Sequence, residues 1–266
     1  MNKYIYFHIC MINNWKEVVG NIFQQLKDSG LYDDIKEIRC SVIGDDLELL
    51  KFLNNDKKIS IIFAATDSKF FAGNYRLITD YREDESRPIH NEEIILNKMW
   101  EDAQKEDFYV LYLHSKGVKK FTEIPNQKSN IEDWVNLMLY FNLYYFRHIE
   151  MKLKEFDAVG VNLEITPKSK KSSEFNIRFS GNFWWSKSEH IRQIQKKIPG
   201  DYGGPENWIS YGKNIKFLSL WNSYTDHYQK SYRPYWYEGH GTKDIVVEYD
   251  VENSKIVKND LSKNKG

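Results

Sequence analysis

A strand-length run of apolar and aromatic residues that stops abruptly at a polar cluster constrains this chain more than any other stretch. The run covers 108–113 and is followed at once by His114, Ser115, Lys116 and Gly117. An uncharged run of this kind is typical of a strand that is covered on both faces of a sheet. Open α/β sheets bind their ligands beyond the carboxyl ends of such strands. The four residues that follow the run are therefore the first candidate site.

The segments before this run alternate between strand and helix patterns. Strands are predicted at 3–9, 35–43 and 59–65, and helices over 15–29 and 46–54. A further amphipathic helix is predicted over 91–106, after a long polar stretch at 66–90. Such an alternation predicts an α/β domain with a mixed, mostly parallel central sheet flanked by helices and joined by right-handed crossovers.

The second half of the chain continues the same pattern with more aromatic residues. Ser129 and Glu132 have capping-box spacing and predict a long helix to about 154, and Ser186 with Glu189 predicts a second helix to about 197. Strands are predicted at 157–162 and 215–220, a polar loop at 165–174 and a short helix from Pro205.

The composition excludes several classes of protein. Lys plus Arg (38) balances Asp plus Glu (38), so no broad basic surface for nucleic acid is expected. No apolar run reaches 18 residues, and the first residues turn polar too early for a signal peptide, so we expect no transmembrane segment. Cys10 and Cys40 lie in predicted core strands, which indicates buried thiols in a reducing compartment. We therefore expect a cytoplasmic protein.

No linker divides the chain, and its aromatic content of 15% is concentrated in part beyond the last predicted strand. We expect one domain over 1–220, an aromatic C-terminal extension packed on it over 221–250, and a flexible tail over 251–266. The aromatic residues between 221 and 237 have three interpretations, namely an acceptor platform, an oligomer contact or a clamp packed on the domain.

The order of these elements, with three local motifs, resembles the GT-A nucleotide-sugar glycosyltransferases. The strand-to-helix unit from Phe7 to Asn14 resembles their first nucleotide-holding unit, and the run at 108–113 resembles the strand that ends in their Asp-x-Asp motif. The sequence Gly-Gly-Pro-Glu-Asn-Trp at 203–208 resembles their acidic helix start. Leu-His-Ser-Lys-Gly at 113–117 and Gly-Asn-Phe-Trp-Trp at 181–185 are similar to a group of glycosyltransferases of polysaccharide gene clusters and large DNA viruses.

The resemblance implies a Rossmann-like GT-A domain that transfers a sugar from a nucleoside-diphosphate sugar to a glycan or other hydroxyl acceptor, with inversion. It assigns Glu206 as the general base. It places the nucleotide or donor near His8, Asp67, Arg76, Ser115 and Gly117, and the sugar or acceptor near Asn162, Asn182, Trp184, Trp185 and His240. Two adjacent tryptophans cannot easily bury both rings in the same pocket, so one of them is expected to line the cleft.

The chain departs from the family where Asp-x-Asp is replaced by His114, Ser115 and Lys116. The missing carboxylates normally hold Mn²⁺ or Mg²⁺, which neutralises the diphosphate leaving group. A lysine repels a divalent ion but pairs with a phosphate oxygen as a point charge. We therefore predict a metal-independent enzyme without a cofactor, in which Lys116, together with His114 and an arginine of the 76–87 loop, stabilises the leaving group. A Mn²⁺ or Mg²⁺ enzyme remains the alternative.

Other interpretations remain open at this point. Glu206 can simply complement a helix dipole, and Asp67 can cap a turn. A catalytically inactive module that binds nucleotide sugars or carbohydrate is the main alternative from another class, and the loss of Asp-x-Asp favours it. An α/β phosphohydrolase ranks lowest, because no carboxylate and histidine cluster has metal-ligand spacing. The donor sugar, the base of the nucleotide, the acceptor and the oligomeric state are not determined by these patterns.

Overall fold

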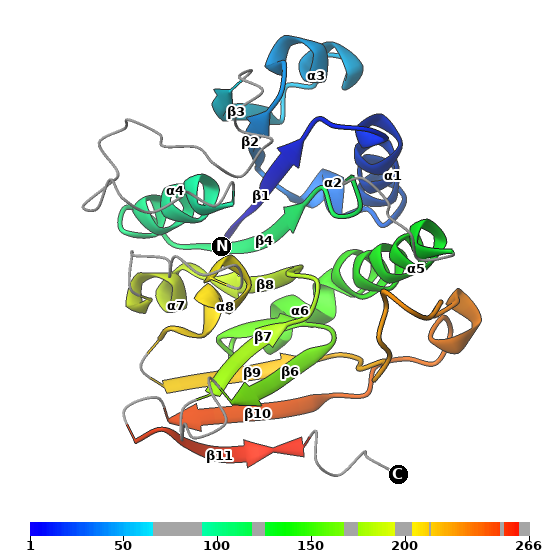
Figure 1. Ribbon diagram of the computed structural model, residues 1–266. Coiled ribbons are helices and arrows are strands. Elements are labelled where there is room, and N and C mark those ends of the chain that lie inside the picture. Colours follow the sequence, from blue (N-terminus) through cyan, green and yellow to red (C-terminus); the bar gives the residue numbers. More distant parts are fainter. Residues whose placement is uncertain are drawn as a thin grey trace, which may run out of the picture.

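The computed structural model describes residues 1–65, 92–118, 126–167, 175–194, 204–212, 214–250 and 253–260. These residues form a nine-stranded sheet in the order β11-β10-β9-β5-β8-β4-β1-β2-β3, and a separate two-stranded hairpin. Helices cover both faces of the sheet, with α1 and α5 on one side and α4 and α7 on the other (Figure 1). The predicted α/β class is confirmed.

The first half of the chain forms a parallel sheet with its helices in the predicted order. Strand β1 pairs in parallel with both β2 and β4, and β2 pairs in parallel with β3. The strands are β1 (Asn2–Cys10), β2 (Glu37–Ile43), β3 (Ile59–Ala65) and β4 (Phe108–His114). The helices are α1 (Trp15–Asp28), α2 (Leu31–Asp34), α3 (Asp46–Phe52) and α4 (Glu93–Ala103).

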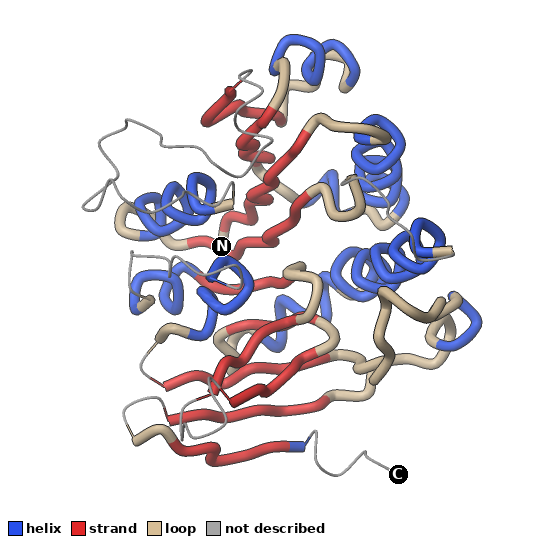
Figure 2. The backbone as a smooth tube through the Cα atoms, viewed as in Figure 1, coloured by secondary structure: helices blue, strands red, loops and turns tan. Residues whose placement is uncertain are grey.

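The second half adds strands of both directions, and Figure 2 shows them in red beside the strands of the first half. Strand β8 is antiparallel to both β4 and β5, and β9 is parallel to β5. Strand β10 is antiparallel to β9 and to β11, so among the described strands of the sheet only β8 and β10 run against the common direction. The bounds are β5 (Ala158–Gly160), β8 (Trp184–Lys187), β9 (Asn214–Ser219), β10 (Ile245–Asp250) and β11 (Lys255–Asn259).

The predicted long aromatic helix is divided by a π-helical segment. Helix α5 (Gln127–Leu139) continues into η2 (Tyr140–Tyr144) and then α6 (Phe146–Lys152). A π-helix opens the hydrogen-bond ladder of a helix, and here the carbonyl of Asn142 accepts a hydrogen bond of 2.9 Å from Trp185 Nε1. The wider turn therefore lets the helix bind a core tryptophan.

Both predicted capping boxes are wrong. Helix α5 begins two residues before Ser129, whose hydroxyl donates to the carbonyl of Asn126. Ser186 lies within β8 and donates to the carbonyl of Asp157, so α7 (Ser188–Gln193) begins later. In each case the serine hydroxyl serves as a donor to a nearby carbonyl and does not accept from the helix N-terminus.

The remaining elements are short. The hairpin consists of β6 (Leu163–Pro167) and β7 (Phe175–Phe179), which pair antiparallel, so the loop predicted at 165–174 begins as strand. Helix α8 (Gly204–Asn207) runs into the 3₁₀ turn η3 (Trp208–Ser210), and η4 (Pro234–Trp236) is a second 3₁₀ turn.

The two adjacent tryptophans belong to opposite core layers. Trp184 and Trp185 are both almost fully buried, at 0% and 2% exposure, and each lies in a different hydrophobic cluster. Successive side chains of a strand point to opposite faces, so β8 buries one ring on each side of the sheet. The expectation that one of them lines the cleft is wrong.

The C-terminal part is more ordered than predicted. Strands β10 and β11 extend the main sheet, so 245–250 is not an appendage and 255–259 is not a flexible tail. Of the two cysteines, Cys40 is buried and Cys10 is half-buried. Among the described helices, none is both long and apolar enough to cross a membrane.

Candidate functional site

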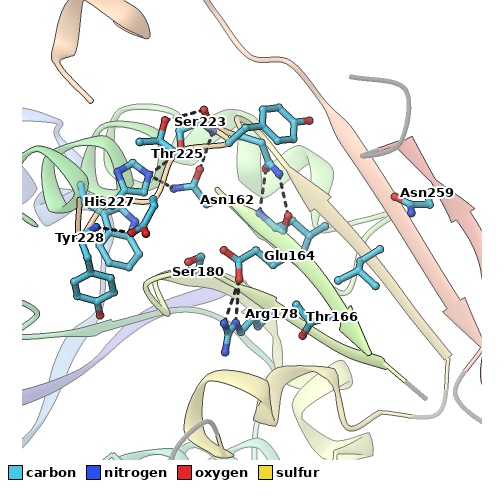
Figure 3. A pocket seen from close by; sticks show the side chains of 16 residues that line it. Asn162, Glu164, Thr166, Arg178, Ser180, Ser223, Thr225, His227, Tyr228 and Asn259 are labelled. Carbon is cyan, nitrogen blue, oxygen red and sulfur yellow. Dashed lines mark hydrogen bonds and ion pairs between the residues drawn. The ribbon is translucent and has the colours of Figure 1, made fainter. Parts of the chain in front are cut away.

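A cavity of about 570 Å³ lies beyond the carboxyl end of β5, between the hairpin and the segment 222–228 (Figure 3). Asn222 holds these two walls together, because its side chain exchanges two hydrogen bonds of 3.0 and 2.9 Å with the backbone of Leu163. The lining residues are Trp134, Asn162, Leu163, Glu164, Ile165, Thr166, Arg178, Ser180, Asn222, Ser223, Tyr224, Thr225, Asp226, His227, Tyr228 and Asn259.

A polar group that we name the cavity cluster (Asn162, Arg178, Ser223 and His227) lies in this wall. Asn162 adopts a left-handed conformation with φ of 52°, and its Oδ1 accepts a hydrogen bond of 2.9 Å from the amide of Ser223. The Ser223 hydroxyl lies 2.7 Å from His227 Nε2, and Asn162 Nδ2 lies 3.4 Å from the same nitrogen. Asn162 thus joins the end of β5 to the aromatic segment, in the region where a ligand role was predicted for it.

His227 is buried and neutral near pH 7. Burial, supported by the nearby charge of Lys116, lowers the pKa of His227 to about 4. Its ring stacks on Trp134 with centroids 5.0 Å apart and planes 7° apart. The amide of Asn162 can only donate to Nε2, so this network assigns the ring proton to Nδ1. That nitrogen has no hydrogen-bond partner within the described residues.

Lys116 lies at the border of the cavity, just beyond β4. Its ammonium is 4.0 Å from the centroid of the Trp134 ring and 5.9 Å from that of Tyr228, and both rings line the cavity. A cation above an aromatic face is held by the ring quadrupole while it keeps its formal charge. The structure thus places a positive charge at the carboxyl end of the central strand.

The neighbours of Lys116 stabilise the loop that carries it. Ser115 Oγ accepts a hydrogen bond of 2.8 Å from the amide of Cys10, and the amide of Ser115 donates to the carbonyl of His8. The hydroxyl of Ser115 therefore ties β4 to β1. Gly117 has φ of 92°, and a Cβ at this position would lie 3.0 Å from Ile131, so the turn requires glycine.

His114 belongs to a second group, the Glu92 cluster (His8, Glu92, Tyr112, His114 and Asn182). Glu92, at the start of α4, accepts hydrogen bonds from the Tyr112 hydroxyl (2.6 Å) and from Asn182 Nδ2 (2.8 Å). His114 Nε2 lies 3.0 Å from the carbonyl of Gly181, and His8 is its register partner on β1. These polar groups therefore bond mostly to one another and to the backbone.

The electrostatics of the Glu92 cluster favour neutral imidazoles beside a charged carboxylate. Burial lowers the pKa of His8 to about 4, and burial also lowers the pKa of His114 despite the nearby Glu92. Burial opposes ionisation of Glu92, but its interactions with His114, His8 and the Tyr112 hydroxyl lower its pKa overall.

Glu206 does not line the cavity itself, but it forms an ion pair with a residue that does. Its carboxylate lies 3.2 Å from Arg178 Nη1, and Arg178 also contacts Glu164 at 3.2 Å. Arg178 and Glu164 line the cavity, and the side chain of Glu206 is about a third exposed. Lys116 and Glu206, the two residues with predicted catalytic roles that lie nearest the cavity, thus approach it from different elements.

Several predicted ligand residues lie elsewhere. Asn182 is fully buried in the Glu92 cluster, where its Oδ1 accepts from Trp184 Nε1, and neither it nor either tryptophan of the pair lines the cavity. His240 is exposed, 3.3 Å from the carbonyl of Tyr235, and is not part of the lining. Asp67 and Arg76 lie outside the described residues.

Five residues of these clusters, among them Glu92, Arg178 and His227, were not singled out from the sequence. Glu92 follows a polar stretch and its partners are 20 and 90 positions away, although an acidic pair before a helix was a usable signal. His227 was counted only as part of an aromatic segment. Arg178 lies in a strand with mixed pattern, and its pairing with Glu206 depends on the hairpin.

Within the part of the chain that the structure describes, no three or more His, Cys, Asp or Glu side chains are arranged to hold a metal ion. The absence of a cofactor therefore stays a prediction, to be tested by experiment.

Comparison with known proteins gives little. No protein-family model matches the chain, and no curated protein matches it. Among solved structures, 4-diphosphocytidyl-2C-methyl-D-erythritol synthase from Anaerococcus prevotii DSM 20548 is similar, with 13% identity and a TM-score of 0.35 over 86% of this chain and 92% of that one. A similarity at this level supports no inference about the chemistry of the site.

Proposed function

We propose that this protein is a glycosyltransferase that moves a sugar from a nucleoside-diphosphate sugar to a glycan or other hydroxyl acceptor, with inversion and without a divalent metal. The observation that carries the proposal is the Lys116 ammonium at the carboxyl end of β4, beside a polar cavity. α/β sheets bind their ligands at this edge. The resemblance to GT-A enzymes and a cytoplasmic role in polysaccharide synthesis belong to the same proposal.

Lys116 would stabilise the leaving group. As the bond between the anomeric carbon and the diphosphate breaks, negative charge grows on the diphosphate, and a fixed ammonium lowers the energy of that transition state. Trp134 holds the ammonium by its ring face. His114 would support the loop by its bond to Gly181, and the predicted contribution of Arg76 is part of the proposal.

Glu206 would act as the general base. The acceptor hydroxyl oxygen attacks the anomeric carbon while its proton passes to the carboxylate. Arg178 holds this carboxylate beside the cavity wall and so fixes its orientation. The donor would lie near the turn at Ser115 and Gly117, since the His8 ring is bonded to Ser41 and is buried. Asp67 remains a proposed nucleotide contact.

The second candidate function is a catalytically inactive module that binds nucleotide sugars or carbohydrate. One observation favours it: the ion pair of 3.2 Å between Glu206 and Arg178 competes with the role of Glu206 as a base. A module of this kind would bind a nucleotide at the same edge of the sheet and would release no diphosphate.

The two candidates differ in turnover. The protein is incubated in EDTA with UDP-, GDP- and dTDP-sugars, and the release of nucleoside diphosphate is measured, together with thermal shifts by the free nucleotides. We expect turnover of at least one donor in EDTA, and a large loss of turnover in Glu206→Gln. If only Glu164→Gln abolishes turnover, Glu164 is the base. Loss of turnover in EDTA that Mn²⁺ restores contradicts the metal-independent mechanism, and a thermal shift without turnover favours the binding module.

A further inference from the structure

We propose that the aromatic side chains of 224–236 form a platform that binds an acceptor oligosaccharide, with its inner end at the cavity and its outer end at Tyr235 and Trp236. The acceptor role rests on the proposed function, whereas the binding of a sugar chain by the platform does not. The sequence left three interpretations of the aromatic segment open, and this proposal is the acceptor platform among them.

The inner end of the platform belongs to the cavity itself. Tyr224 and Tyr228 line the cavity, yet they are 53% and 44% exposed. Their rings are therefore available both to a ligand in the cavity and to one that leaves it. The outer end is still more open, since Tyr235 and Trp236 are 70% and 54% exposed. Exposed aromatic side chains gathered in one short segment commonly mark a binding surface.

A continuous series of ring contacts connects the two ends. Trp134 contacts Tyr228 edge to face at 5.4 Å and stacks on His227 at 5.0 Å between centroids. Beyond the cavity, His227 contacts Tyr232 at 6.0 Å, and Tyr232 stacks on Trp236 at 6.1 Å. Trp236 finally contacts Tyr235 at 5.4 Å. The exposed rings of Tyr228, Tyr235 and Trp236 are thus the outer members of one packed aromatic series.

The segment is held in place although it has little regular structure. Asp133 of α5 contacts both Ser231, which donates a hydrogen bond to it, and Arg233, which pairs with it at 3.4 Å. Pro234 opens the 3₁₀ turn η4, which packs against α5. A surface that is already ordered loses little conformational entropy when it binds a ligand. The platform is therefore preorganised.

The chemistry of this surface fits a sugar chain. Sugar rings carry C–H groups on one face and hydroxyls at their edge, so they need flat apolar rings beside hydrogen-bonding groups. The exposed large hydrophobic residues in this segment are all tyrosine or tryptophan, which combine a ring face with a polar atom. The cavity at its inner end offers Asn162, Ser223 and the Arg178–Glu164 pair. A small acceptor would fill the cavity alone and would gain nothing from Tyr235 and Trp236.

The test measures binding of the full chain to an array of immobilised glycans that carries monosaccharides and oligosaccharides of up to six sugars. We expect binding to at least one oligosaccharide, and at least a tenfold weaker signal for Tyr235→Ala/Trp236→Ala. Binding to the corresponding monosaccharide should stay unchanged. Met151→Ala, which removes an exposed large side chain of α6, is the matched control and should bind as the wild type does.

Three outcomes would overturn the proposal: no binding to any glycan of the array, equal binding by wild type and double variant, or a dimer in sedimentation that the double variant loses without any effect on glycan binding. The last outcome would assign the surface to a second copy of the chain. Release of nucleoside diphosphate from donors alone, with water as acceptor, is measured in parallel. If no nucleoside diphosphate is released while glycan binding is intact, the proposed transferase activity is rejected and the proposed glycan-binding platform is retained.

Discussion

The Glu92 cluster and the cavity cluster lie at the same edge of the sheet and are built from similar parts, but they use them differently. Each contains a buried histidine of lowered pKa and an asparagine with positive φ, Asn182 in one and Asn162 in the other. In the Glu92 cluster both polar atoms of the Asn182 side chain are bonded to other side chains. The cavity cluster instead borders about 570 Å³ of space.

This difference separates polar groups that stabilise the fold from polar groups that are placed to bind a ligand. Buried polar groups that satisfy one another make a rigid network, and each one left alone would cost about 1–3 kcal/mol. Polar groups around a cavity contribute less to folding and remain able to bond a ligand. We therefore expect substitutions in the Glu92 cluster to lower stability, and substitutions at the cavity to lower binding or turnover.

The largest expected effect is on turnover at the border of the cavity. Lys116→Ala should reduce kcat by about 10²- to 10³-fold, as the removal of one preorganised charge-stabilising group does. Lys116→Arg should keep part of the activity, because it keeps the charge. Lys128→Ala is the control, since Lys128 is an exposed lysine paired with Glu17. If Lys116→Ala and Lys128→Ala have equal kcat values, the role of Lys116 is wrong.

The next effect is a loss of stability in acid. The pKa of His8 and of His227 is lowered to about 4 in the folded protein, whereas the unfolded chain binds these protons near pH 6.5. Stability from these groups is therefore complete above about pH 6.5 and is lost as pH falls toward 4. Urea unfolding at pH 7 and pH 5 should differ by about 2 kcal/mol for each histidine.

His8→Asn and His227→Asn should each flatten this pH dependence. The two buried variants also sharpen the comparison. If water reaches the cavity cluster, His227→Asn will reduce the pH dependence of the free energy of unfolding less than His8→Asn does. Equal slopes in the wild type and in both buried variants would contradict the assignment.

The two asparagines provide a matched pair for stability. Glycine keeps the positive φ at either site, so the substitution reports the lost hydrogen bonds. Asn182→Gly leaves Trp184 Nε1 without an acceptor and removes one of the two hydrogen bonds to Glu92, and it should cost about 2–3 kcal/mol. Asn162→Gly removes bonds to Ser223 and His227 beside the cavity and should cost about 1 kcal/mol. Chemical denaturation of both variants measures which one loses more stability. A larger loss in Asn162→Gly than in Asn182→Gly would contradict the contrast between the two clusters.

The smallest effect is expected for the partly exposed ion pairs of the cavity wall. Glu164→Gln should change the free energy of unfolding by less than about 1 kcal/mol, because the partners Glu164 and Arg178 are 41% and 30% exposed and solvent screens them. Thermal denaturation at low and high salt measures this. A larger loss would place the ion pair of the cavity wall among the structural interactions of the fold.

The sequence predicted the parallel half of the sheet well, because β1 to β4 are rich in apolar, β-branched and aromatic residues and α1 shows helical spacing. It failed where a side chain has two possible partners. Ser129 and Ser186 matched a capping pattern, but their hydroxyls bond to nearby carbonyls. Trp184 and Trp185 were judged as a pair in one pocket, whereas a strand sends them to opposite faces.

The candidate site was predictable only where it lies at a strand end. Lys116 was found because β4 ends just before it. Glu92 and His227 were missed, because their surroundings are assembled from residues distant in sequence and from a segment without periodicity. A carboxylate such as Glu92 gains its role from the fold, and the acidic pair at the start of α4 does not identify its partners.

The π-helical segment Tyr140–Tyr144 also sets the rotational phase of the helix that follows. If the same residues followed regular α-helical geometry, at about 100° per residue, α6 would be turned around its axis. Ile149, which is fully buried, would then face another direction, and Trp185 Nε1 would lose the carbonyl that accepts its proton. The wider turn is therefore needed on both of its sides, because it sets the direction of Ile149 in α6 and presents the carbonyl of Asn142 to Trp185.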